Sequence, residues 1–139
     1  MTPQDKKLVQ DSFAAVKPIA DDAAALFYKR LFEIAPQARA LFKGDMKTQG
    51  RKLMQMLTVA VAGLDDLNKL VPAVQELGRR HVAYGAKPEH YKPVGEALIW
   101  TLEQGLGPKF TPDVKKAWIE VYGILSKTMM DAAYAPAAE

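Results

Sequence analysis

The chain contains no cysteine, and this absence excludes several classes of protein. Disulfide bonds, zinc–thiolate sites and iron–sulfur clusters all need cysteine sulfur, so none of them can be built from these 139 residues. The absence also fits a reducing compartment, and the N-terminal residues lack the apolar stretch of a signal peptide. We therefore expect a cytoplasmic protein whose fold depends on its hydrophobic core.

Long apolar runs, strong charge and common catalytic motifs are missing as well. No segment approaches the roughly 18 apolar residues of a membrane helix, so we expect no membrane partner. The 19 basic and 16 acidic residues give a formal net charge of only +3, which predicts no nucleic-acid partner. No glycine-rich phosphate loop, HExxH or GxSxG motif occurs in the sequence.

What the sequence does contain is helical periodicity. Apolar residues recur at helical spacing almost throughout and no window alternates with period two, so we predict an all-α fold. Thr2-Pro3 and Thr111-Pro112 each place proline directly after an N-cap residue, which predicts a helix start. We expect one domain over residues 1–134 and a disordered tail over 135–139. The expected helices run over about residues 3–16, 23–34, 36–42, 47–63, 70–81, 89–106 and 112–133.

Three stretches, in this order along the chain, resemble a known family. They cover residues 26–42, with Tyr28, Pro36 and Phe42, then residues 49–53 and residues 77–81. Together they resemble the haem pocket of a bacterial single-domain globin, and residues 87–95 are similar to the haem domain of flavohaemoglobins. The resemblance extends over nearly the whole chain. It implies a globin fold, with about seven or eight helices packed at steep angles around a pocket for haem b.

The resemblance implies that His81 coordinates the haem iron. A neutral imidazole donates to a metal through one nitrogen, while its other nitrogen usually bonds to a backbone carbonyl or another polar group. An isolated histidine is more often an ordinary core or boundary residue. His81, however, ends an apolar stripe that includes Leu77, which favours the ligand role. The other histidine, His90, lies in a polar break, and we expect it at the surface.

The resemblance also implies that Tyr28, Gln49 and Leu53 form the gas side of the pocket. O₂ held at the iron carries partial negative charge, and a phenol or amide that donates to it contributes about 1–3 kcal/mol. Taken singly, Tyr28 would be a boundary tyrosine, Gln49 a solvent-facing residue and Leu53 a core leucine. Because an amide is a poor iron ligand, we expect the sixth position to be open or held weakly by water. Gly50 is expected to let its helix cross the second helix closely, against Ala24.

Three further residues are assigned to haem contacts by the same resemblance. Phe42 would press its ring against the porphyrin, although it would also serve as an ordinary core aromatic. Lys52 would pair with a haem propionate, with a solvated side chain as the alternative. Tyr91 matches a tyrosine of flavohaemoglobins on the side of the iron ligand. The glutamate that accompanies this tyrosine in that family aligns with Ala133, so the chain departs from the pattern there.

Three functions stay open at this point. The first is a globin that reversibly binds O₂, and also NO and CO, for storage or transport. The second is an enzyme, a nitric oxide dioxygenase that would need a separate reductase. The third is a globin-fold interaction module without haem. The residues of the gas side and His81 argue against the third, because such a module has no need of them.

Overall fold

Helices form nearly all of the structure, so the all-α prediction is confirmed. The computed structural model describes residues 2–41, 45–83 and 90–134, and within these ranges it contains no strand. The α-helices are α1 (Pro3–Val16), α2 (Ala20–Ile34), α3 (Met46–Ala62), α4 (Leu67–Ala83), α5 (Tyr91–Leu106) and α6 (Pro112–Tyr134). Short 3-10 segments join them: η1 (Lys17–Ile19), η2 (Pro36–Leu41), η3 (Gly63–Asp65) and η5 (Gly107–Lys109).

Most helices begin and end where local chemistry predicts. The Thr2 hydroxyl accepts from the Asp5 N–H at 3.1 Å, and the Asp5 carboxylate accepts from the Thr2 N–H at 3.2 Å. This capping box satisfies two donors at the start of α1. The Thr111 hydroxyl accepts from the Val114 N–H at 3.2 Å and so caps α6 with a single hydrogen bond. At Gly107 φ is 56°, a conformation that favours glycine, and there α5 ends.

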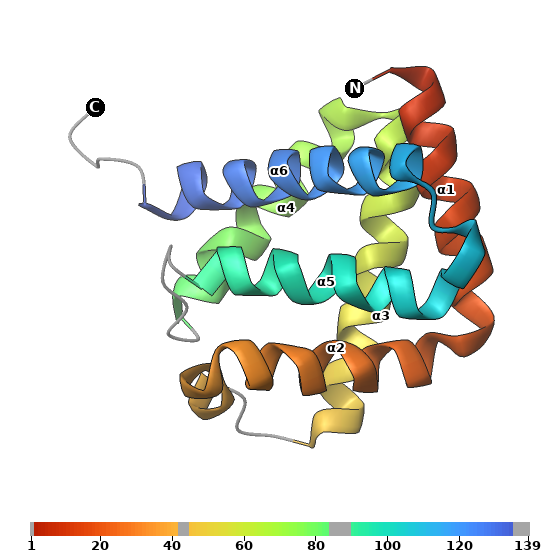
Figure 1. The fold of residues 1–139 in the computed structure, drawn as a ribbon. Helices are drawn as coiled ribbons and strands as arrows, with labels where there is room; N and C mark the ends of the chain where they lie inside the picture. The colour runs from red at the N-terminus through yellow and green to blue at the C-terminus, as the bar shows by residue number, and fades with distance from the viewer. Residues whose placement is uncertain (1, 42–44, 84–89, 135–139) are drawn as a thin grey trace.

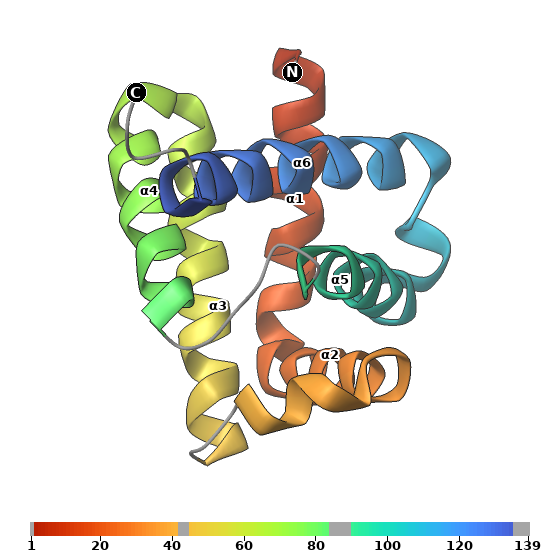
Figure 2. The ribbon, with the colours of Figure 1, turned by 90° about the vertical axis from the view of Figure 1, so that its left-hand side faces the viewer.

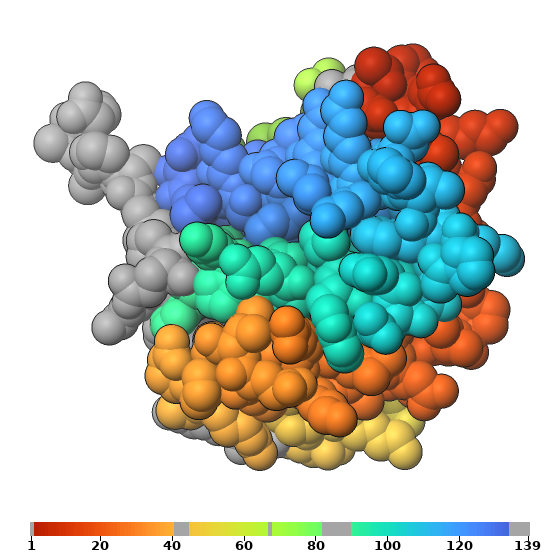
Figure 3. All heavy atoms as spheres, viewed as in Figure 1, coloured from red at the N-terminus to blue at the C-terminus, as the bar shows by residue number. Residues whose placement is uncertain are grey.

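The helices pack in pairs around a central core. Figures 1 and 2 show α2 beside α5 and α6 beside α4 and α1, and Figure 1 shows α3 crossing behind α2. In the space-filling view, α6, α5 and α2 form adjoining bands across one face (Figure 3). The most deeply buried large side chains come from α1, α2, η3 and α6, so the core joins segments far apart in the sequence. These side chains are Val9, Leu31, Leu64, Trp118 and Val121.

Two glycines allow close helix crossings. A Cβ built on Gly50 would lie 2.9 Å from the Cβ of Ala24, which confirms the expected close approach of α3 to α2. A Cβ built on Gly78 would overlap the main chain of Met129, so α4 and α6 are in even closer contact. Both crossings depend on the absence of a side chain. Phe42 and the tail 135–139 lie outside the described residues. Among the described residues, no helix is long and apolar enough to span a bilayer.

The α4–α6 crossing yields a stability prediction. Gly78→Ala should lower the free energy of unfolding by about 1–3 kcal/mol, because the methyl group forces the two backbones apart. Gly123→Ala is the matched control on α6, where a new Cβ meets no atom within 4 Å. Because alanine favours a helix over glycine, this control should raise stability by up to about 1 kcal/mol. Urea unfolding of the three proteins measures both changes, and equal stabilities would contradict the packing assigned to Gly78.

Candidate functional site

A partly open cavity of about 190 Å³ lies between the helices, with a nearly all-apolar lining. A single water needs only about 10–15 Å³ by the same measure, so the space suits a larger, mostly apolar group. The lining comes from η2 and from every α-helix except α1. Its polar or titratable members are Tyr28, His81, His90, Tyr91, Tyr122 and Ser126, together with the indole of Trp118.

His81 lies in the last turn of α4, half-buried, with its ring at the cavity. Its Nδ1 lies 2.7 Å from the main-chain carbonyl oxygen of Leu77. A carbonyl oxygen can only accept, so Nδ1 carries the proton and donates. In a neutral ring the lone pair is then on Nε2, which is the form that coordinates a metal.

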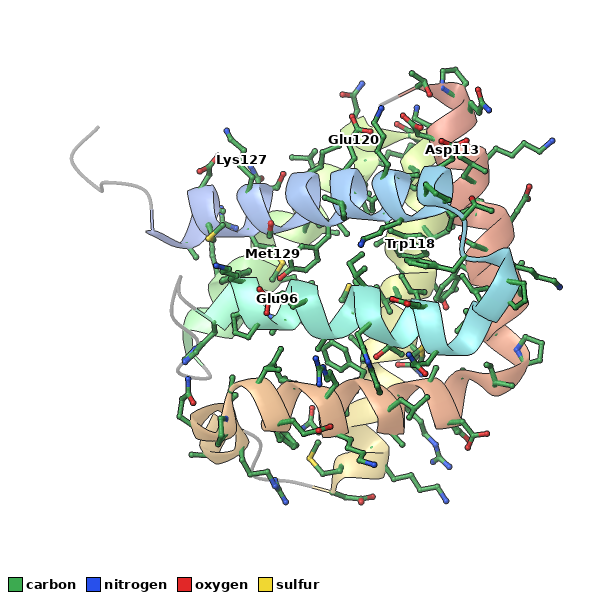
Figure 4. The ribbon with its side chains drawn as sticks, in the orientation of Figure 1. Glu96, Asp113, Trp118, Glu120, Lys127 and Met129 are labelled. Carbon is green, nitrogen blue, oxygen red and sulfur yellow. The ribbon has the colours of Figure 1, made fainter. Side chains whose placement is uncertain are left out.

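A small hydrophobic cluster holds α4 in the position that places His81. Leu70 and Val74 of α4 pack with Tyr91 of α5 and Met129 of α6, and all of them are buried. Figure 4 shows Met129 on the side of α6 that faces α5, with Lys127 on the opposite side. Burial of these side chains therefore fixes the rotation of α4, and with it the direction of the His81 ring.

Tyr28 of α2 is the polar residue at the cavity on the side of η2 and α3. It is buried, and the rings of Phe27 and Phe32 lie against it with centroid distances of 5.0 and 6.1 Å. Burial raises the pKa of its hydroxyl to about 12, so the phenol keeps its proton at neutral pH. The hydroxyl donates to the main-chain carbonyl oxygen of Gln49 at 3.2 Å.

Leu53 and Gln49, the other two residues assigned to the gas side, differ in their positions. Leu53 lines the cavity and is half-buried. Gln49 is half-buried too, but it is not among the lining residues, and its recorded contact with Tyr28 is through the main chain. The structure thus brings Tyr28 and Leu53 together at the cavity and places the Gln49 carbonyl beside the tyrosine.

The tyrosines near His81 include one that sequence reasoning missed. Tyr91, at the start of α5, lines the cavity, and Tyr122 of α6 donates its hydroxyl proton to the Tyr91 carbonyl. Burial, together with the neighbouring Tyr91, raises the pKa of Tyr122 well above its ordinary range. The sequence did contain an indication that Tyr122 faces the core, because it lies one helical turn after Trp118, a large apolar residue that is buried in the structure.

No carboxylate belongs to the described lining of the cavity. Ala133 occupies the position aligned with the flavohaemoglobin glutamate, and Asp131 is exposed, with its carboxylate 3.5 Å from the Lys127 ammonium. Within the described residues no group of three His, Cys, Asp or Glu side chains could hold a metal ion by itself. A metal at this cavity would need ligands from a cofactor such as a porphyrin, with one imidazole added by the chain.

Three other expectations have different outcomes. His90, expected at the surface, is half-buried and lines the cavity, so that expectation is wrong. The surface position was expected because the residues before His90 are polar, but His90 immediately precedes the buried start of α5. Lys52 is exposed and does not line the cavity. Phe42 lies outside the described residues, so its contact with haem stays a prediction.

An all-α fold with an imidazole held at an apolar cavity is the arrangement found in helical haem proteins. The chain belongs to the globin family, because residues 25–129 match the model described as Globin. As a globin it is a haem protein that binds diatomic gases. The family expected from the sequence is thereby confirmed, and the cavity and imidazole fit the haem group.

The relatives of the chain include both short and long proteins. It is 30% identical to the neuroglobin of Danio rerio over 143 residues, covering 93% of this chain and 90% of that protein. It is 32% identical to an uncharacterized globin-like protein of Aquifex aeolicus (strain VF5) over 124 residues, covering 89% and 88%. It is 29% identical to the flavohemoprotein of Bacillus subtilis (strain 168) over 123 residues, covering 86% of this chain and 31% of that longer protein.

The burial of Tyr28 predicts a pH dependence. Its pKa of about 12 lies above the ordinary value of 10.0, so the folded state binds the proton more tightly than the unfolded state. The associated stability is fully present below pH 10.0 and is lost as the pH rises to about 12. Tyrosinate absorbance of the wild type minus that of Tyr28→Phe, recorded while circular dichroism shows folded protein, should titrate near 12. A difference that titrates near 10.0 would contradict the buried position.

Proposed function

We propose that this globin binds haem b with His81 as the axial ligand and binds O₂ reversibly, for storage or transport. The observation that carries the proposal is the His81 ring, which lies at an apolar cavity with Nδ1 bonded to the Leu77 carbonyl. The haem would supply the iron at which the gas binds. Within this assignment the chain holds the iron ligand in one tautomer and one orientation, which lowers the entropic cost of coordination.

The apolar lining supports reversible gas binding. Leu53 of α3 and Val94 and Leu98 of α5 line the cavity with groups that cannot hydrogen-bond water. Excluding water strengthens the interactions made inside the cavity and limits side reactions there. We propose that Lys52, which is exposed near this side of α3, pairs with a haem propionate outside the cavity.

Tyr28 supplies a donor for the bound gas. Its raised pKa keeps the hydroxyl protonated, so it can donate to a ligand that carries partial negative charge. In a dry cavity such a bond contributes about 1–3 kcal/mol, enough to slow gas release roughly tenfold. Tight binding of O₂ is therefore the function that the gas side of the cavity supports best.

The surroundings of His81 favour a carrier over an oxidase-like enzyme. Its Nδ1 donates to a neutral carbonyl, and no carboxylate lies in the described lining of the cavity. A carboxylate partner would give the imidazole more anionic character and increase electron donation to the iron. With a neutral acceptor the imidazole donates less, which suits binding without further reaction.

A second candidate function is nitric oxide dioxygenation, which the likeness to a flavohemoprotein favours. Overall, O₂, NO and one electron give nitrate, so each turnover needs an electron from a reductase. The chain spans less than a third of the Bacillus flavohemoprotein, and this candidate requires a reductase that supplies the electron.

Absorption spectra of the purified protein with added haem test the proposal. A five-coordinate ferrous spectrum that changes sharply and reversibly with O₂ is expected. Nitrate formation from NO at a rate limited by an added reductase would instead favour the dioxygenase. If the protein takes up no haem, both candidate functions are contradicted, and the globin-fold interaction module without haem is the remaining alternative.

The histidine assignment is tested by haem retention. His81→Ala should weaken haem binding by roughly tenfold or more, because the iron loses its protein ligand. His90→Ala is the control, because His90 lines the same cavity and has no place in the proposed coordination. The rate of haem transfer to excess apomyoglobin measures both variants. If only the His90 variant loses haem faster than the wild type, the axial ligand is His90 and not His81.

The gas-side assignment is tested by O₂ release. Tyr28→Phe should speed O₂ dissociation about tenfold, because the ring stays and only the donor is lost. Gln49→Leu is the matched comparison, since the Gln49 side chain does not line the cavity while its carbonyl is kept. Stopped-flow replacement of O₂ by CO gives the rates. A larger effect at residue 49 than at Tyr28 would mean that the amide is the donor.

A further inference from the structure

The hydroxyl proton of Tyr28 faces two acceptors if the proposed function holds. The structure shows it donated to the main-chain carbonyl of Gln49, at 3.2 Å. The same side chain lines the cavity where the gas would bind. A hydroxyl has a single proton, so it cannot make a full hydrogen bond to both acceptors at once.

The carbonyl that accepts this proton is held in place by a helix crossing. It belongs to the peptide bond between Gln49 and Gly50, and Gly50 is the residue at which α3 meets α2. A Cβ at Gly50 would lie 2.9 Å from the Cβ of Ala24, closer than side chains normally approach. Since Ala24 and Tyr28 are one turn apart on α2, the crossing sets the distance between the carbonyl and the hydroxyl.

We propose that the main-chain carbonyl of Gln49 competes with the bound gas for the hydroxyl proton of Tyr28, and that the Gly50–Ala24 crossing sets the strength of this competition. The inference rests on the proposed function. Gas with partial negative charge is the stronger acceptor, but its gain is reduced by the bond that Tyr28 gives up. Gly50 and the peptide carbonyl before it are thus positioning elements for the gas donor, whereas the Gln49 amide is not.

The test separates the helices and then restores their approach. Gly50→Ala should push α3 away from α2, lengthen the bond from Tyr28 to the carbonyl and leave the proton to the gas. The double variant Ala24→Gly, Gly50→Ala has the same number of methyl groups as the wild type and should restore the crossing. CO on the ferrous haem protein is the probe, because its stretching frequency falls when a donor points at it.

Gly50→Ala should therefore lower the CO stretching frequency and slow O₂ release roughly fivefold. The double variant should return both values to those of the wild type. In a Tyr28→Phe background, Gly50→Ala should change neither quantity. An unchanged frequency in Gly50→Ala, or a shift that persists without the Tyr28 hydroxyl, would overturn the proposal.

A second variant and a haem-free measurement cover the case in which Gly50→Ala does not fold. Ala24→Ser adds a single atom on the other side of the crossing and should shift the CO frequency in the same direction. In the haem-free protein, Tyr28→Phe should raise the unfolding constant about fivefold, and by clearly less when combined with Ala24→Ser. Equal effects would refute the competition. If Tyr28→Phe leaves O₂ release unchanged, the proposed gas role itself fails, which distinguishes the two failures.

Discussion

The bond between the His81 ring and the Leu77 carbonyl is the interaction on which the site depends. It selects the tautomer with a lone pair on Nε2, and it can form because both residues lie one turn apart on α4. The bond alone does not aim the ring at the cavity. That direction comes from α4 lying against α6, where Gly78 permits a contact with the main chain of Met129 that no other residue would allow.

A second hydrogen bond at the cavity joins α2 to α3, because Tyr28 of α2 donates to the main-chain carbonyl of Gln49 on α3. Tyr28 is buried between Phe27 and Phe32, and burial keeps its hydroxyl protonated far above neutral pH. The donor is also occupied, since the chain offers it an internal acceptor at Gln49. Under the proposed gas role of Tyr28, the affinity for the gas depends on the difference between two hydrogen bonds, so a small change in helix spacing would alter the affinity without any change at the cavity wall.

Much of the fold could be predicted from local chemistry. The N-caps at Thr2 and Thr111 and the break at Pro36 each follow from a few neighbouring residues, and the structure places helix boundaries at all of them. The resemblance singled out Tyr28, Leu53, His81 and Tyr91, and all four line the cavity. His90 and Tyr122 were missed as lining residues, because a polar neighbourhood or a place in a long helix says little about which side chain reaches a cavity formed by other helices.

The sequence by itself determined the helices, the family and the residue that offers an imidazole, because capping, periodicity and residue order act over short distances. Only the tertiary structure decided which groups of Gln49 and Tyr28 meet and that His90 faces the cavity. It also decided that no carboxylate belongs to the described lining of the cavity. These outcomes depend on the rotation and spacing of helices packed against each other, which arise from close contacts such as Gly50 with Ala24 and are set by no single segment.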